Sequence, residues 1–435
     1  MRAILTTLLA TAAACHPASP APGHPDDQPD AGTVATPDAP DGSCAPGLAG
    51  APCVLALYDR TVADCSLLVK LRGELDARAS MGPLWAAGRG LFRTPLAVAG
   101  GWNAWSTTAL VGAPVCGSDL VVAVGPVATG RWPYKLVDTS SNWSLDATNP
   151  AFAYDDFAGN ADGKNSVIDT PDSGLGHIVT FGQECSASLG DCREVTAYLP
   201  AGYDAPGNGA KTYPVLFMHD GQNLWDDHTC CFGHTGWEIN VTLDAEIAAG
   251  KVAPIVVIGA ASTVARNNQY GLDATTTEAF IQFQVMQLQP HALAHVRGDG
   301  QRDRIAGSSL GGLMAMELGL RYPSIYAAAA SLSGAFWPGQ DTHTALRDLL
   351  PTYGKQAVAV YLDHGGDPAT NADGAVDTIE VRNMMSGMGW LEADSPTCVP
   401  GPNALCYHAE PGATHDELAW KARAWRFLEF LFPAS

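Results

Sequence analysis

A Gly-x-Ser-x-Gly pattern occupies residues 307–311, which read GSSLG. It follows a short strand-like segment at 304–306 and precedes a run of strong helix formers at 313–320. Glycines at both ends of such a pattern permit a sharp strand-to-helix turn that projects the central hydroxyl. The pattern therefore predicts Ser309 as a nucleophile. The alternative is a plain Gly-Ser turn, in which Ser308 would be an equal neighbour.

A nucleophilic serine needs a base, and His415 is the best placed histidine. It lies in the loop 412–417, directly before an amphipathic helix expected at 420–431. Hydrolases built around this turn have the chain order serine, acid, histidine, and His415 fits the last place. His219 ends an expected strand, and we interpret it as a residue that orients the following loop.

The acid of such a triad should follow the strand-like segment 356–363, which reads QAVAVYLD. We prefer Asp367, because an acid in the turn beyond the strand can reach an imidazole. Asp363 is the second choice and could instead cap the turn. The loop at 371–374 partly copies a calcium-binding loop, but Ala369 occupies its first ligand position, so no metal is expected there.

Two backbone amides are expected to hold the negative oxygen that develops during attack on a carbonyl. One belongs to Leu310, directly after the nucleophile, where the following helix also directs its dipole at that oxygen. The other is expected in the loop after the strand 214–219. Gly221 lets the chain turn there, and we favour the amide of Gln222.

Strand-like and helix-like segments alternate through the second half of the chain. Apolar runs ending in turn residues occur at 214–221, 253–262 and 356–366, and a helical stretch is expected at 280–296. This alternation favours a mostly parallel sheet with helices on both faces. The sequence therefore predicts an α/β fold, with an α/β-hydrolase domain over 177–435.

Residues 44–173 are expected to form a separate domain of short strands, because β-rich runs recur there between glycines, prolines and asparagines. These runs are at 54–59, 65–73, 119–125 and 132–138. The motifs GWNAW, YKLVD, NWSLD and KNSVI follow in an order that resembles the early-set immunoglobulin-like sandwich of glycogen- and starch-binding modules. Exposed tryptophans of such modules can stack on sugars. The alternative, which we favour, makes Trp102, Trp105 and Trp143 structural.

The first residues are typical of an export signal. Arg2 precedes an apolar run at 4–10, and small residues lead to Cys15. This ending resembles the bacterial lipobox, which implies a lipid on Cys15; an ordinary cleaved signal peptide is the alternative. Residues 16–43, rich in Pro, Asp, Ala and Gly, are expected to be a disordered tether. The segment 1–15 thus predicts an exported, membrane-anchored bacterial lipoprotein, at the cell surface or in the periplasm.

The cysteine count agrees with export. Setting Cys15 aside leaves ten of the eleven cysteines, an even number that suits an oxidising compartment. Three pairs are close enough in sequence to close short loops, and a fourth could bridge the N-terminal domain: Cys44/Cys53, Cys185/Cys192, Cys398/Cys406 and Cys65/Cys116. The adjacent Cys230 and Cys231 form either a vicinal bridge or bonds to separate partners. The connectivity stays open, and disulfides are favoured over a zinc site.

The charge limits the partners. The sequence carries 45 acidic against 24 basic residues, a formal net charge of -21. Such a field repels phosphates, which argues against nucleic acid or an anionic membrane surface as partner. Membrane attachment is expected only through the lipid on Cys15, and no cofactor is required by the predicted chemistry.

The second half resembles the esterase family that includes esterase D, enterochelin esterases, feruloyl esterases and the mycolyltransferases. Five segments within 212–432 carry the resemblance: YPVLFMHDGQNLW (213–225), WE (237–238), RNNQY (266–270), IAGSSLGG (305–312) and GATHDELAW (412–420). The resemblance implies that Ser309 and His415 are catalytic and that Gln222 and Leu310 supply the oxyanion amides. Within the matching segments, the candidate substrate contacts are Trp225, Arg266 and Tyr270.

Together these features predict a secreted carboxylic-ester hydrolase that works through an acyl-enzyme. The expected substrate is a carbohydrate-linked acyl or feruloyl ester, or a siderophore ester. One alternative is acyl transfer to a sugar hydroxyl on the same fold. Another, of a different class, is a non-catalytic surface lipoprotein that binds glycans.

Overall fold

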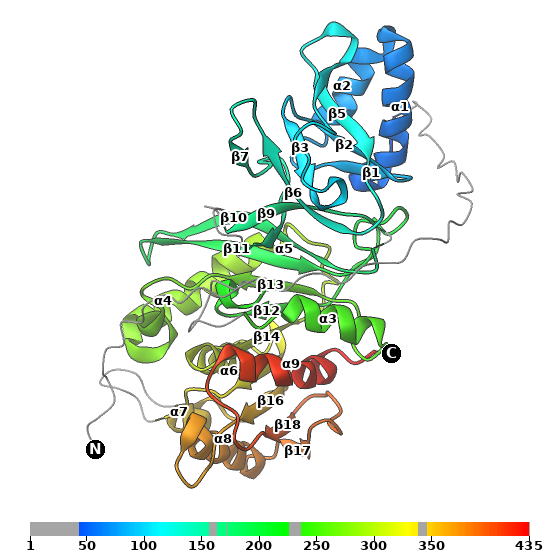
Figure 1. The fold of residues 1–435 in the computed structure, drawn as a ribbon. Coiled ribbons are helices and arrows are strands. Elements are labelled where there is room, and N and C mark those ends of the chain that lie inside the picture. The colour runs from blue at the N-terminus through cyan, green and yellow to red at the C-terminus, as the bar shows by residue number, and fades with distance from the viewer. Residues whose placement is uncertain (1–42, 156–162, 172, 226–235, 338–345, 435) are drawn as a thin grey trace. The chain divides into compact units, whose positions relative to one another are not determined.

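The structure is a computed structural model, and its description covers most of the chain (Figure 1). The described residues are 43–155, 163–171, 173–225, 236–337 and 346–434. The predicted export signal with Cys15, the predicted tether and the pair Cys230 and Cys231 lie outside them.

A mostly parallel run of strands forms the centre of the second half. In sheet order the parallel strands are β17 (Leu391–Asp394), β18 (Ala404–Ala409), β16 (Ala359–His364), β15 (Tyr326–Leu332), β14 (Asp303–Ser308), β12 (Val215–Met218) and β13 (Val256–Ala260). An antiparallel pair, β11 (Asp191–Leu199) and β10 (His177–Ser186), continues the sheet beyond β13. Apolar side chains alternate between the two faces, so the sheet must be covered on both.

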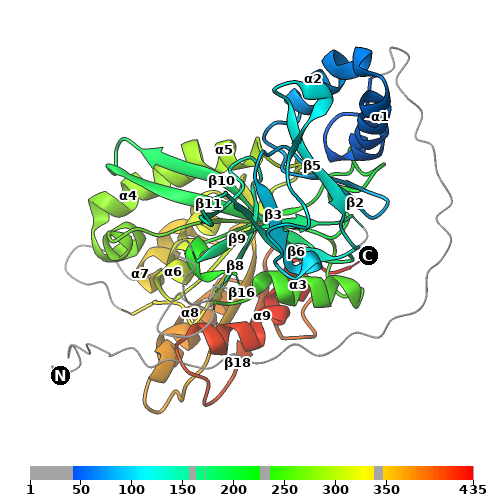
Figure 2. The ribbon, with the colours of Figure 1, turned by 45° about the horizontal axis from the view of Figure 1, so that its top comes forward.

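Helices cover both faces of this sheet (Figures 1 and 2). On one face, Tyr361 of β16 packs in a core with α3 (Ile239–Ala248) and α9 (Glu417–Leu431). On the other, Val360 packs in a core with α4 (Ala274–Phe283), α5 (Gln289–Leu293), α6 (Leu310–Arg321), α7 (Leu346–Tyr353) and α8 (Ala375–Gly387). The predicted α/β fold is confirmed.

Two helices replace strands that the sequence predicted near the start of the described chain. The segments 54–59 and 65–73 lie in α1 (Ala51–Ala63) and in α2 (Leu68–Asp76) with the short turn before it. The strand predictions are wrong because a short apolar run does not reveal its own period. Buried Ala51, Val54, Leu55 and Thr61 recur at helical spacing.

The rest of the N-terminal region is antiparallel. A four-stranded sheet has the order β1 (Leu84–Ala86), β2 (Arg89–Phe92), β5 (Val121–Pro126) and β4 (Ala113–Pro114). Further strands extend the large sheet beyond β10: β8 (Ala151–Tyr154), β9 (Lys164–Asp169), β6 (Arg131–Val137) and β3 (Ala97–Gly100), with β7 (Trp143–Ser144) beside β6. These antiparallel strands are consistent with a β-sandwich. The assignment to the immunoglobulin-like class and the domain boundary at 173 stay predictions.

The three tryptophans of the predicted sandwich have different surroundings. Trp102 is half-buried and stacks on Phe92 with ring centroids 5.8 Å apart. Trp105 and Trp143 are 37% and 44% exposed, and their rings lie 6.2 Å apart. Trp102 is therefore a packing residue, whereas Trp105 and Trp143 form an exposed aromatic pair.

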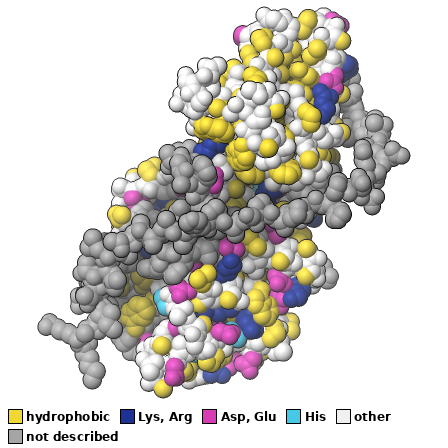
Figure 3. All heavy atoms as spheres, in the orientation of Figure 1, with side chains coloured by type: hydrophobic (Ala, Val, Ile, Leu, Met, Phe, Trp, Pro, Cys, Tyr) yellow, Lys and Arg dark blue, Asp and Glu magenta, His cyan; other side chains and the backbone are white. Residues whose placement is uncertain are grey.

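Four disulfides are present in the described chain, and each joins one of the four candidate pairs named from the sequence. They join Cys44 to Cys53, Cys65 to Cys116, Cys185 to Cys192 and Cys398 to Cys406. Disulfides of this number persist in oxidising compartments, which indicates an extracellular or periplasmic protein. Among the described helices, none has the length and apolar composition to cross a membrane. Figure 3 shows acidic and basic side chains interspersed on one face.

The largely buried His177 is expected to make the stability of the fold depend on pH. The ring of His177 on β10 lies between Asp169, 3.5 Å from Nδ1, and Asp204, 3.3 Å from Nε2, with Arg131 and Asp244 close by. Burial lowers the pKa of His177, but the two carboxylates outweigh it and raise this pKa from 6.5 to about 9. The charged ring therefore stabilises the fold fully below pH 6.5, and this contribution is lost as the pH rises through 9.

We expect the free energy of unfolding of the wild type to fall between pH 6 and 10 by on the order of 3 kcal/mol more than that of His177→Gln. Urea denaturation of both proteins across this range measures the difference. Parallel pH curves for the two proteins would show that folding does not raise the pKa of the His177 ring.

Candidate active site

Ser309 sits at a strained turn between β14 and α6. Its φ of 55° and ψ of -125° are outside the conformations that most residues adopt, and it precedes the first residue of the helix. The turn requires glycine at its base, because a Cβ on Gly307 would lie 2.5 Å from the backbone of Gly311. The strand-turn-helix geometry that the sequence pattern predicted around Ser309 is thus present.

The end of β15 fixes this turn from the side. The amide of Ser309 donates to the carbonyl of Leu332 at 3.1 Å, and the amide of Ala335 donates to the carbonyl of Ser309 at 2.9 Å. Leu310 is the first residue of α6, so its own amide has no acceptor within the helix. That amide and the helix dipole are available to an anion beside Ser309.

The imidazole of His415 pairs with the carboxylate of Asp373. The His415 Nδ1 and Asp373 Oδ1 atoms are 2.5 Å apart, which leaves Nε2 as the other ring nitrogen for a reaction. The side chain of His415 is 34% exposed, whereas that of Asp373 is 2% exposed. The ring of His415 also packs edge-on against Trp420 of α9, with centroids 5.1 Å apart. A carboxylate at one nitrogen fixes the tautomer and orientation of the ring.

Asp373 is in turn held by groups around the ends of β15 and β16. Its Oδ2 accepts hydrogen bonds from the hydroxyl of Ser333, at 2.6 Å, and from the amide of Gly365. The Ser333 hydroxyl accepts from Trp420 Nε1 at 3.0 Å and from a guanidinium nitrogen of Arg423 at 2.5 Å. This network directs the one hydroxyl proton of Ser333 to Asp373.

The two acids that the sequence favoured lie elsewhere. Asp367 is exposed, and its side chain accepts from the nearby amide of Ala369 at 2.8 Å. Asp363 is fully buried in an ion pair with Arg423, 3.0 Å from its Nε. As partner of His415, both choices are corrected to Asp373, which lies in the loop that resembles a calcium site in sequence. The physical reason is that the chain loops back after Asp367 before α8 begins.

Ser309 and the His415–Asp373 pair converge on one turn. The turn follows β15: Leu332 bonds the Ser309 amide, and the adjacent Ser333 bonds the Asp373 carboxylate. Parallel strands end on the same edge of a sheet, so the loops after β14, β15 and β16 meet there. The serine, imidazole and carboxylate therefore share the carboxyl edge of the sheet.

The loop after β12 borders the same edge. Asp220 has a left-handed backbone with φ 59°, and Gly221 packs so closely that a Cβ would lie 2.6 Å from the backbone of Gly259. The Gln222 side chain is fixed by Ser262, which it contacts through two hydrogen bonds of 2.8 Å. These contacts hold the backbone of Gln222 in one conformation, as an oxyanion amide would require.

Of the three candidate substrate contacts, Arg266 is the most accessible. It makes a bidentate ion pair with Asp220, at 2.6 and 2.7 Å, and its side chain is 27% exposed. Tyr270 is buried beneath it, and burial raises the pKa of its hydroxyl. Trp225 is fully buried and donates to Thr196 at 2.9 Å, so the structure assigns it to the core and corrects the prediction of a substrate contact.

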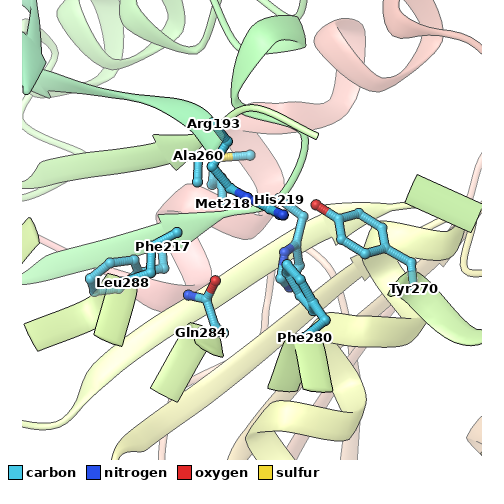
Figure 4. Close-up of a pocket in the computed structure, with 9 residues that line it drawn as sticks. All are labelled: Arg193, Phe217, Met218, His219, Ala260, Tyr270, Phe280, Gln284 and Leu288. Carbon is cyan, nitrogen blue, oxygen red and sulfur yellow. The ribbon is translucent and has the colours of Figure 1, made fainter. Parts of the chain in front are cut away.

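A small cavity lies under this loop (Figure 4). Its volume is about 10 Å³, and Tyr270, Phe280 and Gln284 line it together with His219. Burial lowers the pKa of His219 to about 4, so its ring is neutral near pH 7. The cavity has room for about one water molecule and not for an acyl group, which makes it part of the support of the loop. Elsewhere in the described chain, no group of three or more His, Cys, Asp or Glu side chains is arranged to hold a metal.

Comparisons with known proteins show the family of the chain. The model of the family described as "Putative esterase" matches residues 186–423. The chain is 31% identical to the iron(III) enterobactin esterase of Dickeya dadantii (strain 3937) over 156 residues, 35% of this chain and 32% of that protein. It is 23% identical to the uncharacterized protein YbbA of Bacillus subtilis (strain 168) over 256 residues, 55% of this chain and 92% of that one.

The solved structures to which the chain is similar include two esterases. One is a ferulic acid esterase, at 20% identity and a TM-score of 0.45, with 59% of this chain and 98% of that chain covered. Another is the enterobactin esterase of Shigella flexneri, at 15% identity and a TM-score of 0.43, with 81% and 96% covered. Because the family model matches more than half of the sequence, the chain belongs to this esterase family and is a carboxylic-ester hydrolase.

Proposed function

We propose that the chain cleaves carboxylic esters through an acyl-enzyme, with Ser309 as nucleophile, His415 as base and Asp373 as the acid that orients the base. The observation that carries this proposal is the 2.5 Å contact between His415 and Asp373, at the sheet edge where the Ser309 turn lies. A buried carboxylate behind a partly exposed imidazole is the arrangement that activates a serine hydroxyl.

The proposed reaction has two halves. Ser309 Oγ attacks the ester carbonyl while His415 Nε2 accepts the hydroxyl proton, and the carbonyl oxygen becomes negative. The backbone amides of Leu310 and Gln222 donate to that oxygen. His415 then returns the proton to the departing alcohol, which leaves an acyl group on Ser309. Water attacks this ester by the same route and releases the acid.

For the substrate, we propose an ester of an acyl or aromatic acid with a sugar, or a siderophore ester. The names of the relatives support these classes, since they include an enterobactin esterase and a ferulic acid esterase. The exposed pair Trp105 and Trp143 supports a sugar, because an aromatic face suits the apolar face of a sugar ring. With a sugar hydroxyl in place of water, the same acyl-enzyme would give acyl transfer.

The proposed location is outside the cytoplasm, with Cys15 carrying a lipid. The four disulfides support the oxidising compartment. The lipid itself rests on the sequence around Cys15. Mass spectrometry of the processed protein from a bacterial membrane fraction would test for this lipid. An unmodified Cys15 at the N-terminus, directly after cleavage at Ala14, would contradict the proposed lipid.

The nucleophile can be identified by labelling. We expect a fluorophosphonate ester to abolish hydrolysis of p-nitrophenyl acetate and to add one phosphonyl group, mapped by peptide mass spectrometry to Ser309. Ser309 is partly exposed and shares the sheet edge with the His415 imidazole, so we expect it to be the most reactive hydroxyl. Loss of activity with the label on another residue would overturn the assignment. A screen of short acyl, feruloyl and catechol-siderophore esters on the unlabelled protein then ranks the substrate classes.

A further inference from the structure

Two histidines outside the proposed active site direct the same ring nitrogen at each other. His291 lies in α5, and His295 follows one helical turn later. Their Nε2 atoms are 3.1 Å apart, and the two rings stand nearly perpendicular, with an interplanar angle of 79°. Both side chains reach solvent, so a small ion has access to the two nitrogens.

Each of these rings is also held in place by a residue of β10. The Nδ1 atom of His291 pairs with the carboxylate of Glu184 on β10. Glu184 is itself fixed by Gln287, whose side-chain amide also donates to the carbonyl of Cys185. The ring of His295 stacks on Phe181 of the same strand, with centroids 5.0 Å apart. The arrangement is therefore pre-formed between the hairpin of β10 and β11 and the helical segment around α5.

We propose that His291 and His295 bind a divalent transition-metal ion of the zinc class through their Nε2 atoms. Zinc–nitrogen bonds of about 2.0–2.1 Å place two imidazole nitrogens about 2.9 Å apart at a right angle and about 3.3 Å apart in a tetrahedron. The observed 3.1 Å lies between these values. Glu184 takes the place of the carboxylate that orients a metal-binding histidine through its other ring nitrogen.

The protonation of the pair is compatible with this binding. The Nδ1–H of His291 donates to Glu184, so its Nε2 carries a lone pair. In the metal-free protein, Nε2–H of His295 donates to that lone pair. On binding, His295 shifts its proton to Nδ1 and both Nε2 lone pairs face the ion. Two protein ligands are fewer than in a closed structural site, so water molecules complete the coordination.

Binding of the ion should stabilise the contact between the β10–β11 hairpin and the helical segment around α5. The test is titration of the full chain with ZnCl2 in chelator-free buffer, followed by calorimetry and by thermal unfolding. We expect one saturable site at this position and an unfolding temperature that rises with zinc concentration. His295→Ala, at an exposed position, should weaken this site at least tenfold. Glu184→Gln should weaken it by about 10- to 100-fold, because it removes the orienting charge.

Controls separate this site from other histidines. His408→Ala, which removes a ring paired with Glu410, should leave zinc affinity unchanged, and so should the double change His228→Ala and His234→Ala. Hydrolysis of p-nitrophenyl acetate should continue in His295→Ala, which distinguishes this proposal from that of the active site. Equal zinc affinity in wild type and His295→Ala, or no saturable binding by the wild type, would overturn it.

Discussion

Replacing Ser309 by alanine is expected to lower kcat for ester hydrolysis by at least about 10^4-fold, because no other group can form the acyl-enzyme. The turn that carries Ser309 is fixed by main-chain bonds to Leu332 and Ala335, which the substitution leaves in place. KM should therefore change little. The melting temperature should stay the same or rise, because the main-chain bonds that hold the turn remain. Steady-state kinetics with p-nitrophenyl butyrate and a thermal melt measure both quantities.

Ser308→Ala is the matched control for this substitution. Ser308 ends β14, is buried and adjoins the nucleophile in sequence, but its side chain takes no part in the proposed chemistry. We expect its kcat to remain within about threefold of wild type, as for a conservative change outside the reacting groups. Equal losses in the two alanine variants would point to damage of the turn. Full activity in Ser309→Ala would refute the proposed nucleophile.

Replacing Asp373 by asparagine is expected to lower kcat by roughly 10^3- to 10^4-fold. The substitution removes the charge that stabilises the imidazolium formed during attack. Its amide can also donate to His415 Nδ1, which places the ring proton on Nε2, where it blocks acceptance of the serine proton. The pH dependence of kcat/KM on p-nitrophenyl acetate should show the change, because the variant recovers activity only where hydroxide replaces the base.

Asp367→Asn provides the comparison, because both substitutions remove one carboxylate charge from neighbouring loops. Asp367 is exposed, and among the contacts of the described residues its side chain accepts a hydrogen bond only from the main-chain amide of Ala369. We expect its activity to stay within about twofold of wild type. If Asp367→Asn instead had the lower kcat of the two variants, Asp367 would be the acid. The contact of Asp373 with His415 would then be a packing contact.

The sequence was sufficient for the central fold because its signals there are local. The turn around Ser309 has its glycines, its strand and its helix within about twenty residues, and the apolar runs of the parallel strands are bounded by turn residues. Three of the four disulfide pairings were accessible for the same reason, since they join cysteines 7 to 9 residues apart.

The acid could not be found in this way, because its identity depends on the path of a loop. Three acidic residues lie within eleven positions at the end of β16 and in the loop after it, namely Asp363, Asp367 and Asp373. Only the tertiary structure shows that Arg423, sixty residues later, neutralises the first and that Ser333 and Gly365 hold the third. The sequence does have an Asp-Gly turn, Asp373-Gly374, directly before α8. Many other turns contain such a pair, so it does not single out Asp373 as the acid.

Near the start of the described chain, the error had a different origin. The run VLALYD at 54–59 has the composition of a strand and the length of either element. Its helical state is set by what it packs against, namely α2 and the strands β1, β2 and β5 that share its core. Trp225 was misassigned for a similar reason, because a motif places a residue in sequence but does not say which way its side chain points.

The Ser333 network ties the proposed chemistry to helix α9. His415 precedes that helix directly, and Trp420 and Arg423 within it bond the hydroxyl that supports Asp373. The base and its acid therefore become ordered only when α9 has docked, after every other described element has been synthesised. A chain that is still emerging from the ribosome, or still being threaded across a membrane, would carry Ser309 without a working base. The chain would thus gain ester-hydrolysing activity only after α9 has been synthesised and has docked.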